Sequence, residues 1–168
     1  MEAYKFLLEK VEIEVPTDYK QYVKPELLEI VSGENTKLKI TIKNISEETF
    51  PGGSIERWSI LMYGAAVSPG HITSELTKEE LARMKVPKLD PGAAHQIEYV
   101  LVSMIPGLTE VSLKIASEDK KPVLYLRHLE EAGKDELKFL LYAVDRETLK
   151  VLSSLNKLIK LIEKLVGK

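Results

Sequence analysis

Within residues 33–46 of the chain, apolar and polar residues alternate strictly from Lys37 to Lys43. Leu38, Ile40 and Ile42 are separated by lysine and threonine residues. In an extended strand this period of two places every apolar side chain on one face and every polar side chain on the other. A strand with one solvated face is typical of an antiparallel sheet. The pattern therefore predicts half of a β-sandwich core.

Further stretches of the chain have the same extended character. They are rich in β-branched and alternating apolar residues, and turns containing proline, glycine or asparagine separate them. In residues 55–63, Trp58 shares a face with Ile60 and Met62, so we expect its indole ring in the core. The predicted strands cover residues 6–15, 27–31, 37–45, 55–63, 95–104, 111–116, 123–129 and 137–144.

The later strands follow one another closely enough to suggest hairpins. We expect residues 95–104 and 111–116 to pair across the turn at Ile105, Pro106 and Gly107, and residues 123–129 to pair with 137–144. The alternative for 137–144 is a helix, because some of its apolar residues also have helical spacing.

Two helices are predicted outside the strands. Thr77 and Glu80 have the spacing of a capping box, which predicts a short helix to about Met84 that crosses between the sheets. After Asp145, a favourable N-cap residue, apolar residues recur every three or four positions and predict an amphipathic helix from Arg146 to about Val166. We therefore divide the chain into a sandwich, residues 1–145, and a C-terminal helix, residues 146–168.

Composition restricts the function. The chain has 168 residues, enough for one sizeable core, and it has no cysteine, so disulfide bonds and thiolate chemistry are excluded. A net charge of −2 gives no reason to expect nucleic-acid binding. The high content of lysine and glutamate is common in proteins from hot environments and suggests thermostability. The N-terminal segment lacks the features of a secretory signal, so we expect a cytoplasmic protein, or an extracellular one if the chain is a fragment of an exported protein.

The sequence contains no motif that indicates catalysis. There is no phosphate-binding glycine loop, no nucleophile elbow and no dinucleotide-binding fingerprint. His71, His95 and His128 are far apart in sequence, and none has a second ligand at a metal-binding spacing. We therefore expect a protein that is not an enzyme and that has no cofactor and no metal.

Three segments together resemble a known family. These are GENTKLKITIKNIS, beginning at Gly33, then FPGG, beginning at Phe50, and then KLDPG followed by HQIEYVLV, beginning at Lys88. In this order they resemble the immunoglobulin-like domains of archaeal and bacterial proteins related to cell adhesion (CARDB-like), over about residues 27–116. The resemblance implies a sandwich of seven or eight strands that serves as a spacer, adhesion or recognition module without catalysis.

The C-terminal helix carries the strongest indication of function. Its apolar residues require a partner surface, because leaving so many of them in water is unfavourable. One interpretation is packing against a sheet of the same chain. Another is self-association or docking of a protein partner, and the third, ranked last, is contact with a membrane surface through the lysine-rich face. The candidate interaction residues follow the 4-3-4-3 spacing of paired helices: Val151, Leu155, Leu158, Ile162 and Leu165.

The alternative function is that of a ligand-binding sandwich, with carbohydrate as the preferred ligand. Its candidate residues are Trp58, Tyr63 and His71 in and beside a small-residue loop. Aromatic rings stack on sugars only where their faces are exposed. The strand pattern places Trp58 and Tyr63 on opposite faces, which favours Trp58 as a core residue.

Overall fold

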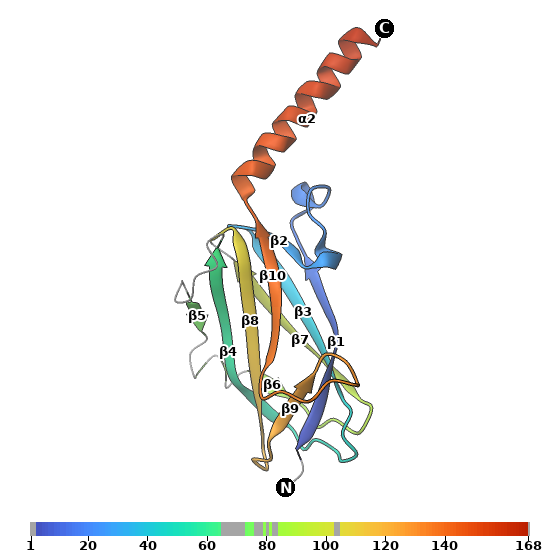
Figure 1. The fold of residues 1–168 in the computed structure, drawn as a ribbon, viewed down its shortest axis with the longest axis vertical. Helices are drawn as coiled ribbons and strands as arrows, with labels where there is room; N and C mark the ends of the chain where they lie inside the picture. The colour runs from blue at the N-terminus through green and yellow to red at the C-terminus, as the bar shows by residue number, and fades with distance from the viewer. Residues whose placement is uncertain are drawn as a thin grey trace.

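Two β-sheets face one another in the computed structural model, and one long helix leaves them at one end (Figure 1). The structure describes residues 3–64, 73–75, 79, 81, 84–102 and 105–167. The described strands are β1 (Tyr4–Glu14), β2 (Glu29–Val31), β3 (Asn35–Asn44), β4 (Gly53–Gly64), β5 (Thr73–Glu75), β6 (Lys85–Val86), β7 (Ala94–Val102), β8 (Gly107–Ser117), β9 (Val123–Leu126) and β10 (Leu137–Val144). The described helices are the 3-10 turns η1 (Thr17–Tyr19) and η2 (Pro25–Leu27) and the α-helix α2 (Arg146–Val166).

The strands divide into a four-stranded and a six-stranded sheet. Sheet A has the order β7-β3-β1-β9, and sheet B has the order β2-β10-β8-β4-β5, with β6 also paired to β4. Most neighbours are antiparallel, as predicted, but β9 pairs with β1 and β2 pairs with β10 in parallel. The predicted mainly β sandwich with a C-terminal helix is therefore confirmed.

The core lies between the two sheets and uses the faces that the alternation predicted. Leu38, Ile40 and Ile42 of β3 are fully buried, and Trp58 of β4 is 1% exposed. At the end of the sandwich near the N-terminus, the ring of Phe50 packs edge-on against those of Tyr4 and Phe6, with centroids 5.2 and 5.0 Å apart. Such edge-to-face aromatic pairs add to the free energy gained from burial alone.

Both predicted hairpins are wrong. β7 pairs with β3 in sheet A, whereas β8 pairs with β4 and β10 in sheet B. Likewise, β9 pairs with β1 in sheet A, whereas β10 lies in sheet B. The connection between β9 and β10 pairs with β9 at a single bridge, between Lys134 and Tyr125. Alternation defines which face of a strand is buried, but both sheets bury a face in the same core. A short connection can therefore cross from one sheet to the other.

Two other predictions concern helices. Residues 137–144 form a strand, so the helical alternative for this segment is wrong. The helix predicted from Thr77 to about Met84 lies largely outside the described residues. The C-terminal helix begins at Arg146 and ends at Val166, as predicted, and points away from the sandwich at the end opposite the N-terminus (Figure 1).

Candidate interaction surface

The first turn of α2 is fixed to the sandwich by polar contacts. Asp145 caps the helix, because its side chain accepts a hydrogen bond from the backbone N–H of Glu147. The backbone N–H of Arg146 donates to Oγ of Ser32 at 3.1 Å, and its guanidinium donates to the carbonyl of Gly33 at 3.3 Å. Gly33 has a φ of +76°, and a Cβ there would lie only 3.2 Å from the guanidinium carbon. Glycine at this turn therefore admits the arginine that anchors the helix.

The segment at η1 contacts one side of the next two turns. Leu149 is buried, and Nδ2 of Asn156 donates a hydrogen bond to the hydroxyl of Tyr22 at 3.3 Å. Ser153 and Lys157 line a shallow hollow of about 660 Å³ between this segment and the helix. At 100° per residue these positions share one side of α2. The helix therefore faces its own sandwich with a mainly polar side.

The opposite side of α2 is apolar and exposed. The predicted interaction residues are all here, with exposed fractions of 59% for Val151, 48% for Leu155, 53% for Leu158, 50% for Ile162 and 77% for Leu165. Four more apolar residues of the helix are also exposed, and two of them, Leu152 and Ile159, lie next to Asn156 at the border of the polar side. We call this set the apolar stripe: Val151, Leu152, Leu155, Leu158, Ile159, Leu161, Ile162, Leu165 and Val166.

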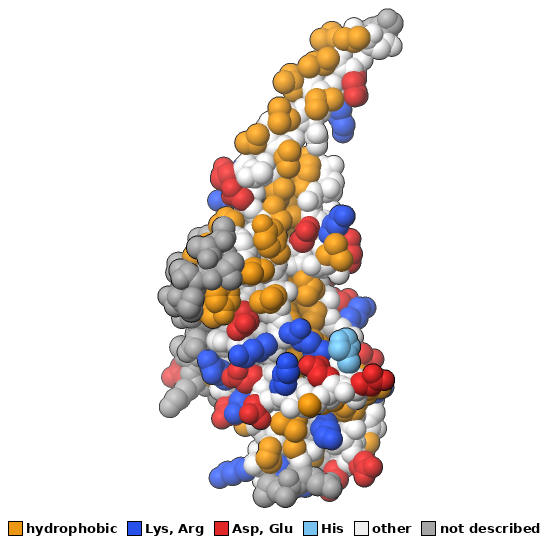
Figure 2. All heavy atoms as spheres, viewed as in Figure 1, with side chains coloured by type: hydrophobic (Ala, Val, Ile, Leu, Met, Phe, Trp, Pro, Cys, Tyr) orange, Lys and Arg blue, Asp and Glu red, His pale blue; other side chains and the backbone are white. Residues whose placement is uncertain are grey.

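Packing of the stripe against a sheet of the same chain, one of the interpretations drawn from the sequence, is not what the structure shows. The contacts with the sandwich come from the side of the helix that carries Leu149 and Asn156. Figure 2 shows the apolar side chains running along the helix and continuing onto the face of the sandwich below it. The apolar stripe is therefore accessible to another molecule.

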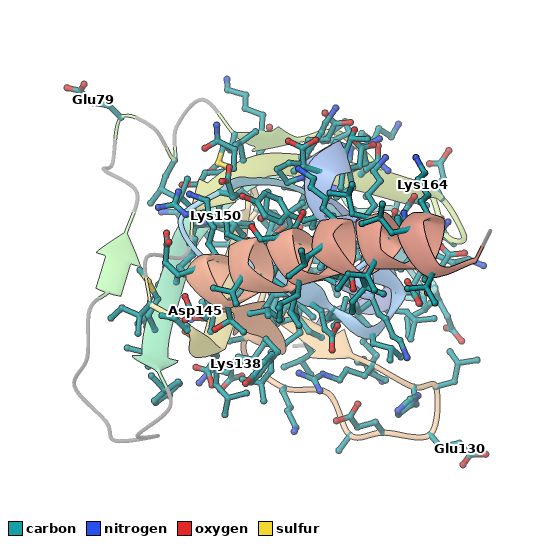
Figure 3. All side chains as sticks on the ribbon, turned by 90° about the horizontal axis from the view of Figure 1, so that it is seen from above. Glu79, Glu130, Lys138, Asp145, Lys150 and Lys164 are labelled. Carbon is teal, nitrogen blue, oxygen red and sulfur yellow. The ribbon has the colours of Figure 1, made fainter. Side chains whose placement is uncertain are left out.

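The lysines of α2 lie on a different side of the helix from the apolar stripe. In Figure 3, viewed from above, Lys150 and Lys164 point to one side of α2, and Lys138 of β10 lies beyond the other side. No described helix combines the length and the apolar character that a membrane crossing requires.

A second surface feature is a cavity of about 590 Å³ beside the connection between β9 and β10. Glu136 forms ion pairs there with Arg57 at 3.1 Å and with Lys138 at 3.4 Å. Burial raises the pKa of the Tyr125 phenol at the edge of this cavity, and the phenol oxygen accepts a hydrogen bond from the backbone N–H of Ile115 at 2.6 Å. The charges around the cavity are thus largely paired with one another.

The structure does not bring together the residues proposed for a ligand-binding loop. Trp58 is in the core, where its ring lies 4.8 Å from that of Tyr99, so it offers no exposed face to a sugar. Tyr63 is only partly buried, and His71 lies outside the described residues. Within the described part of the chain, no group of three His, Asp or Glu residues is placed to hold a metal ion.

Burial lowers the pKa of the His95 imidazole in β7.

Comparisons with known proteins concern the fold. No protein-family model matches the chain, and no curated protein matches it. Among solved structures, the chain is similar to the solution NMR structure of the CARDB domain of a Pyrococcus furiosus protein. The TM-score is 0.46 at 14% identity, with 86% of this chain and 98% of that chain covered. For the crystal structure of the same domain in complex with di-metal ions, the TM-score is 0.44 at 12% identity, with 87% and 98% covered.

A β-glucosidase from Listeria innocua is also similar, with a TM-score of 0.42 at 18% identity. The match covers 84% of this chain but only 16% of that enzyme. The chain forms a two-sheet β-sandwich. Its similarity to CARDB domains, which the motifs of residues 27–116 predicted, extends over most of the chain at low identity.

Sequence reasoning missed the residues that orient the helix. Arg146 and Asn156 were not distinguished from other polar residues, and their partners Gly33 and Tyr22 lie more than a hundred positions away in the sequence. The additional stripe residues did carry a signal, because Leu152, Ile159 and Val166 repeat every seven residues. A repeat of seven places them along one line of the helix, beside the predicted interaction residues.

Proposed function

We propose that the chain is a non-enzymatic β-sandwich module that assembles with a second copy of itself through α2. The observation that carries this proposal is the apolar stripe. Its nine side chains are 42% to 77% exposed, while the contacts of the helix with the sandwich come from Leu149 and Asn156 in its first three turns. An apolar surface of this size on a soluble protein indicates an interaction site.

The gain from covering the stripe is large. Burying the exposed half of one leucine, isoleucine or valine side chain contributes about 1 kcal/mol. For nine such residues this is on the order of 5 to 10 kcal/mol for each copy. Association of two copies buries both stripes, which offsets the loss of translational and rotational freedom on binding.

The pattern of the stripe favours a second copy as the partner. Val151, Leu155, Leu158, Ile162 and Leu165 form a seam with 4-3-4-3 spacing that no charged residue interrupts. Such a seam is complementary to itself, because each apolar layer of one helix meets an apolar layer of the other. The lysines lie on another side of the helix, so pairing through the seam keeps these like charges apart.

The proposal is tested by measuring the solution mass of the intact chain by sedimentation over a wide range of concentration. We expect a dimer or a larger oligomer that dissociates on dilution. Leu158→Gln combined with Ile162→Gln should weaken association about a thousandfold, because four side chains in a pair of copies each lose about 1 kcal/mol. Glutamine is a good helix former, so the helix itself is preserved.

The matched control places glutamine on the polar side of the same turns. Lys157→Gln combined with Lys160→Gln should leave the solution mass unchanged. Circular dichroism checks that all variants keep the sheet and helix signals. A wild-type chain that stays monomeric at every concentration, or a stripe variant that associates as tightly as the wild type, would overturn the proposal.

A further inference from the structure

Sheet B carries an unexpected apolar patch on its outer face. Leu140 and Tyr142 of β10 are 48% and 50% exposed, although the outer face of such a sheet is normally polar. In the register of the sheet, Tyr142 lies beside Leu108 of β8. Leu140 and Leu61 both lie beside Glu110, one on each side of β8. We call Leu61, Leu108, Leu140 and Tyr142 the sheet patch.

The sheet patch and the apolar stripe lie on the same side of the molecule. Figure 2 shows apolar side chains along the helix that continue onto the half of the sheet B face nearest to it, with charged residues farther down. Lys150 and Lys164 point away from this side, as their position relative to Lys138 in Figure 3 shows. Together, the stripe and the patch form a mainly apolar surface over α2 and the strands β4, β8 and β10, with Glu110 between Leu61 and Leu140.

The helix of the same chain does not reach this patch. Arg146, Leu149 and Asn156 hold its first three turns against the segments at residues 17–23 and 32–34. Folding α2 back onto sheet B would break each of these contacts. An occupant of the patch therefore comes from another molecule.

We propose, on the basis of the assembly proposed above, that the second copy is antiparallel and that the free end of its α2 contacts the sheet patch at Tyr142, the patch residue nearest to α2 along the chain. The most exposed members of the stripe are Leu165 and Val166, at 77% and 76%, and both belong to that free end. The helix has 21 residues and is thus about 31 Å long. When two such helices lie antiparallel over their full length, the free end of each reaches the base of the other.

The seam fits this arrangement. In an antiparallel register, Leu155 packs against Leu158 of the second copy, and Ile162 packs against its Val151. In this register the two Ile159 residues are five residues apart along the helix pair, about 7.5 Å. Leu165 reaches the level of Thr148, next to β10. The two contacts are reciprocal, as a two-fold interface requires. A parallel pair would instead place both free ends together and leave the sheet patch away from the helix contact.

Cross-linking with single cysteines tests the orientation, because the chain has no cysteine of its own. With a short bis-maleimide, we expect Ile159→Cys to form a covalent dimer with itself and Leu165→Cys to form none. A mixture of Leu165→Cys and Tyr142→Cys should give a covalent heterodimer. A strong homodimer of Leu165→Cys, or the absence of the mixed product, would overturn the antiparallel arrangement.

Charge substitution tests the patch itself. Leu140→Lys combined with Tyr142→Lys should raise the dissociation constant at least tenfold. Val100→Lys is the matched control, because Val100 is an equally exposed apolar strand residue, at 57%, on sheet A. Unchanged association of the sheet patch variant, with circular dichroism showing an intact fold, would contradict the proposal.

The two proposals fail in different ways. If the stripe variant of α2 becomes monomeric while the patch variant associates normally, the assembly function stands and the role of sheet B is refuted. If the wild-type chain is monomeric throughout, the assembly function fails and the role of sheet B fails with it.

Discussion

The hydroxyl of Tyr22 accepts a hydrogen bond of 3.3 Å from the side-chain amide of Asn156, and this bond joins the segment after η1 to the third turn of α2. Asn156 lies on the side of the helix opposite Leu158 and Leu165 of the apolar stripe. Together with Arg146 and Leu149, it sets the direction in which the helix leaves the sandwich. The direction of α2 in turn decides which surface the stripe presents to a second copy.

Removing this bond should loosen the helix without unfolding the protein. We expect Asn156→Ala and Tyr22→Phe each to change the free energy of unfolding by less than about 1 kcal/mol, because the bond is exposed to solvent. Spin labels at Glu47→Cys and Glu163→Cys measure the distance from the sandwich to the free half of α2. With the labelled protein diluted in unlabelled wild type, the distance distribution should broaden in both variants. An unchanged distribution would mean that Arg146 and Leu149 alone orient the helix.

Local patterns predicted much of the fold, and the reason is visible in particular residues. Alternation around Leu38 and Trp58 correctly defined buried faces, and Asp145 correctly marked the start of α2. The same patterns did not determine the sheet to which β8 or β10 belongs. A strand can bury its apolar face equally well in either sheet. The sheet to which it belongs depends on its pairing with strands that are distant in the sequence.

The candidate site was predictable to a similar extent. Helical periodicity identified the apolar stripe, because spacing alone determines which residues share a side. It did not show whether the sandwich covers that side. That outcome depends on Tyr22 and Asn156, which are 134 positions apart and form no local pattern.

The N-cap of α2 should matter most for the helix itself. The Asp145 carboxylate accepts hydrogen bonds from the backbone N–H of Glu147 at 3.2 Å and from Oγ1 of Thr148 at 3.0 Å. Replacing Asp145 with alanine should cost about 1 kcal/mol of helix stability, and Asp145→Asn should cost much less. Because most of α2 projects from the sandwich, we expect the loss as fraying, measured as a weaker helical circular dichroism signal with the sheet signal unchanged. Equal signals for the alanine and asparagine variants would argue against the cap.

The buried hydroxyl of Tyr125 should stabilise the sandwich. It accepts a hydrogen bond of 2.6 Å from the backbone N–H of Ile115 in β8. The pairing of β8 with β10 ends at Leu113, so Ile115 lies beyond it. Tyr125→Phe leaves this buried N–H without its partner, so unfolding in urea should show a loss of about 1 to 3 kcal/mol. Tyr142→Phe removes an exposed hydroxyl from β10 and is the matched control, with no expected change in stability. Equal stability of the two variants would show that another group satisfies Ile115.

Asp119 should make the protein sensitive to acid. Its carboxylate accepts hydrogen bonds from Oγ of Ser117 and from the hydroxyl of Tyr4, both at 2.6 Å, and from the backbone N–H of Lys121 at 3.1 Å. These bonds, the one from Ser117 first, lower the pKa of Asp119 from 3.8 to about 2. The folded state therefore favours the charged carboxylate. Its contribution to stability is complete above the ordinary pKa and is lost as the pH falls through about 2.

Two substitutions measure this contribution. Asp119→Asn should lower the urea midpoint at neutral pH, and the difference from the wild type should shrink as the pH approaches about 2. Tyr4→Phe removes one of the donors, so an NMR titration should show a higher pKa for Asp119 than in the wild type. A difference between wild type and Asp119→Asn that stays constant across the acid range would contradict the assigned role. It would mean that the ionised form of Asp119 is not specifically stabilised by Ser117 and Tyr4.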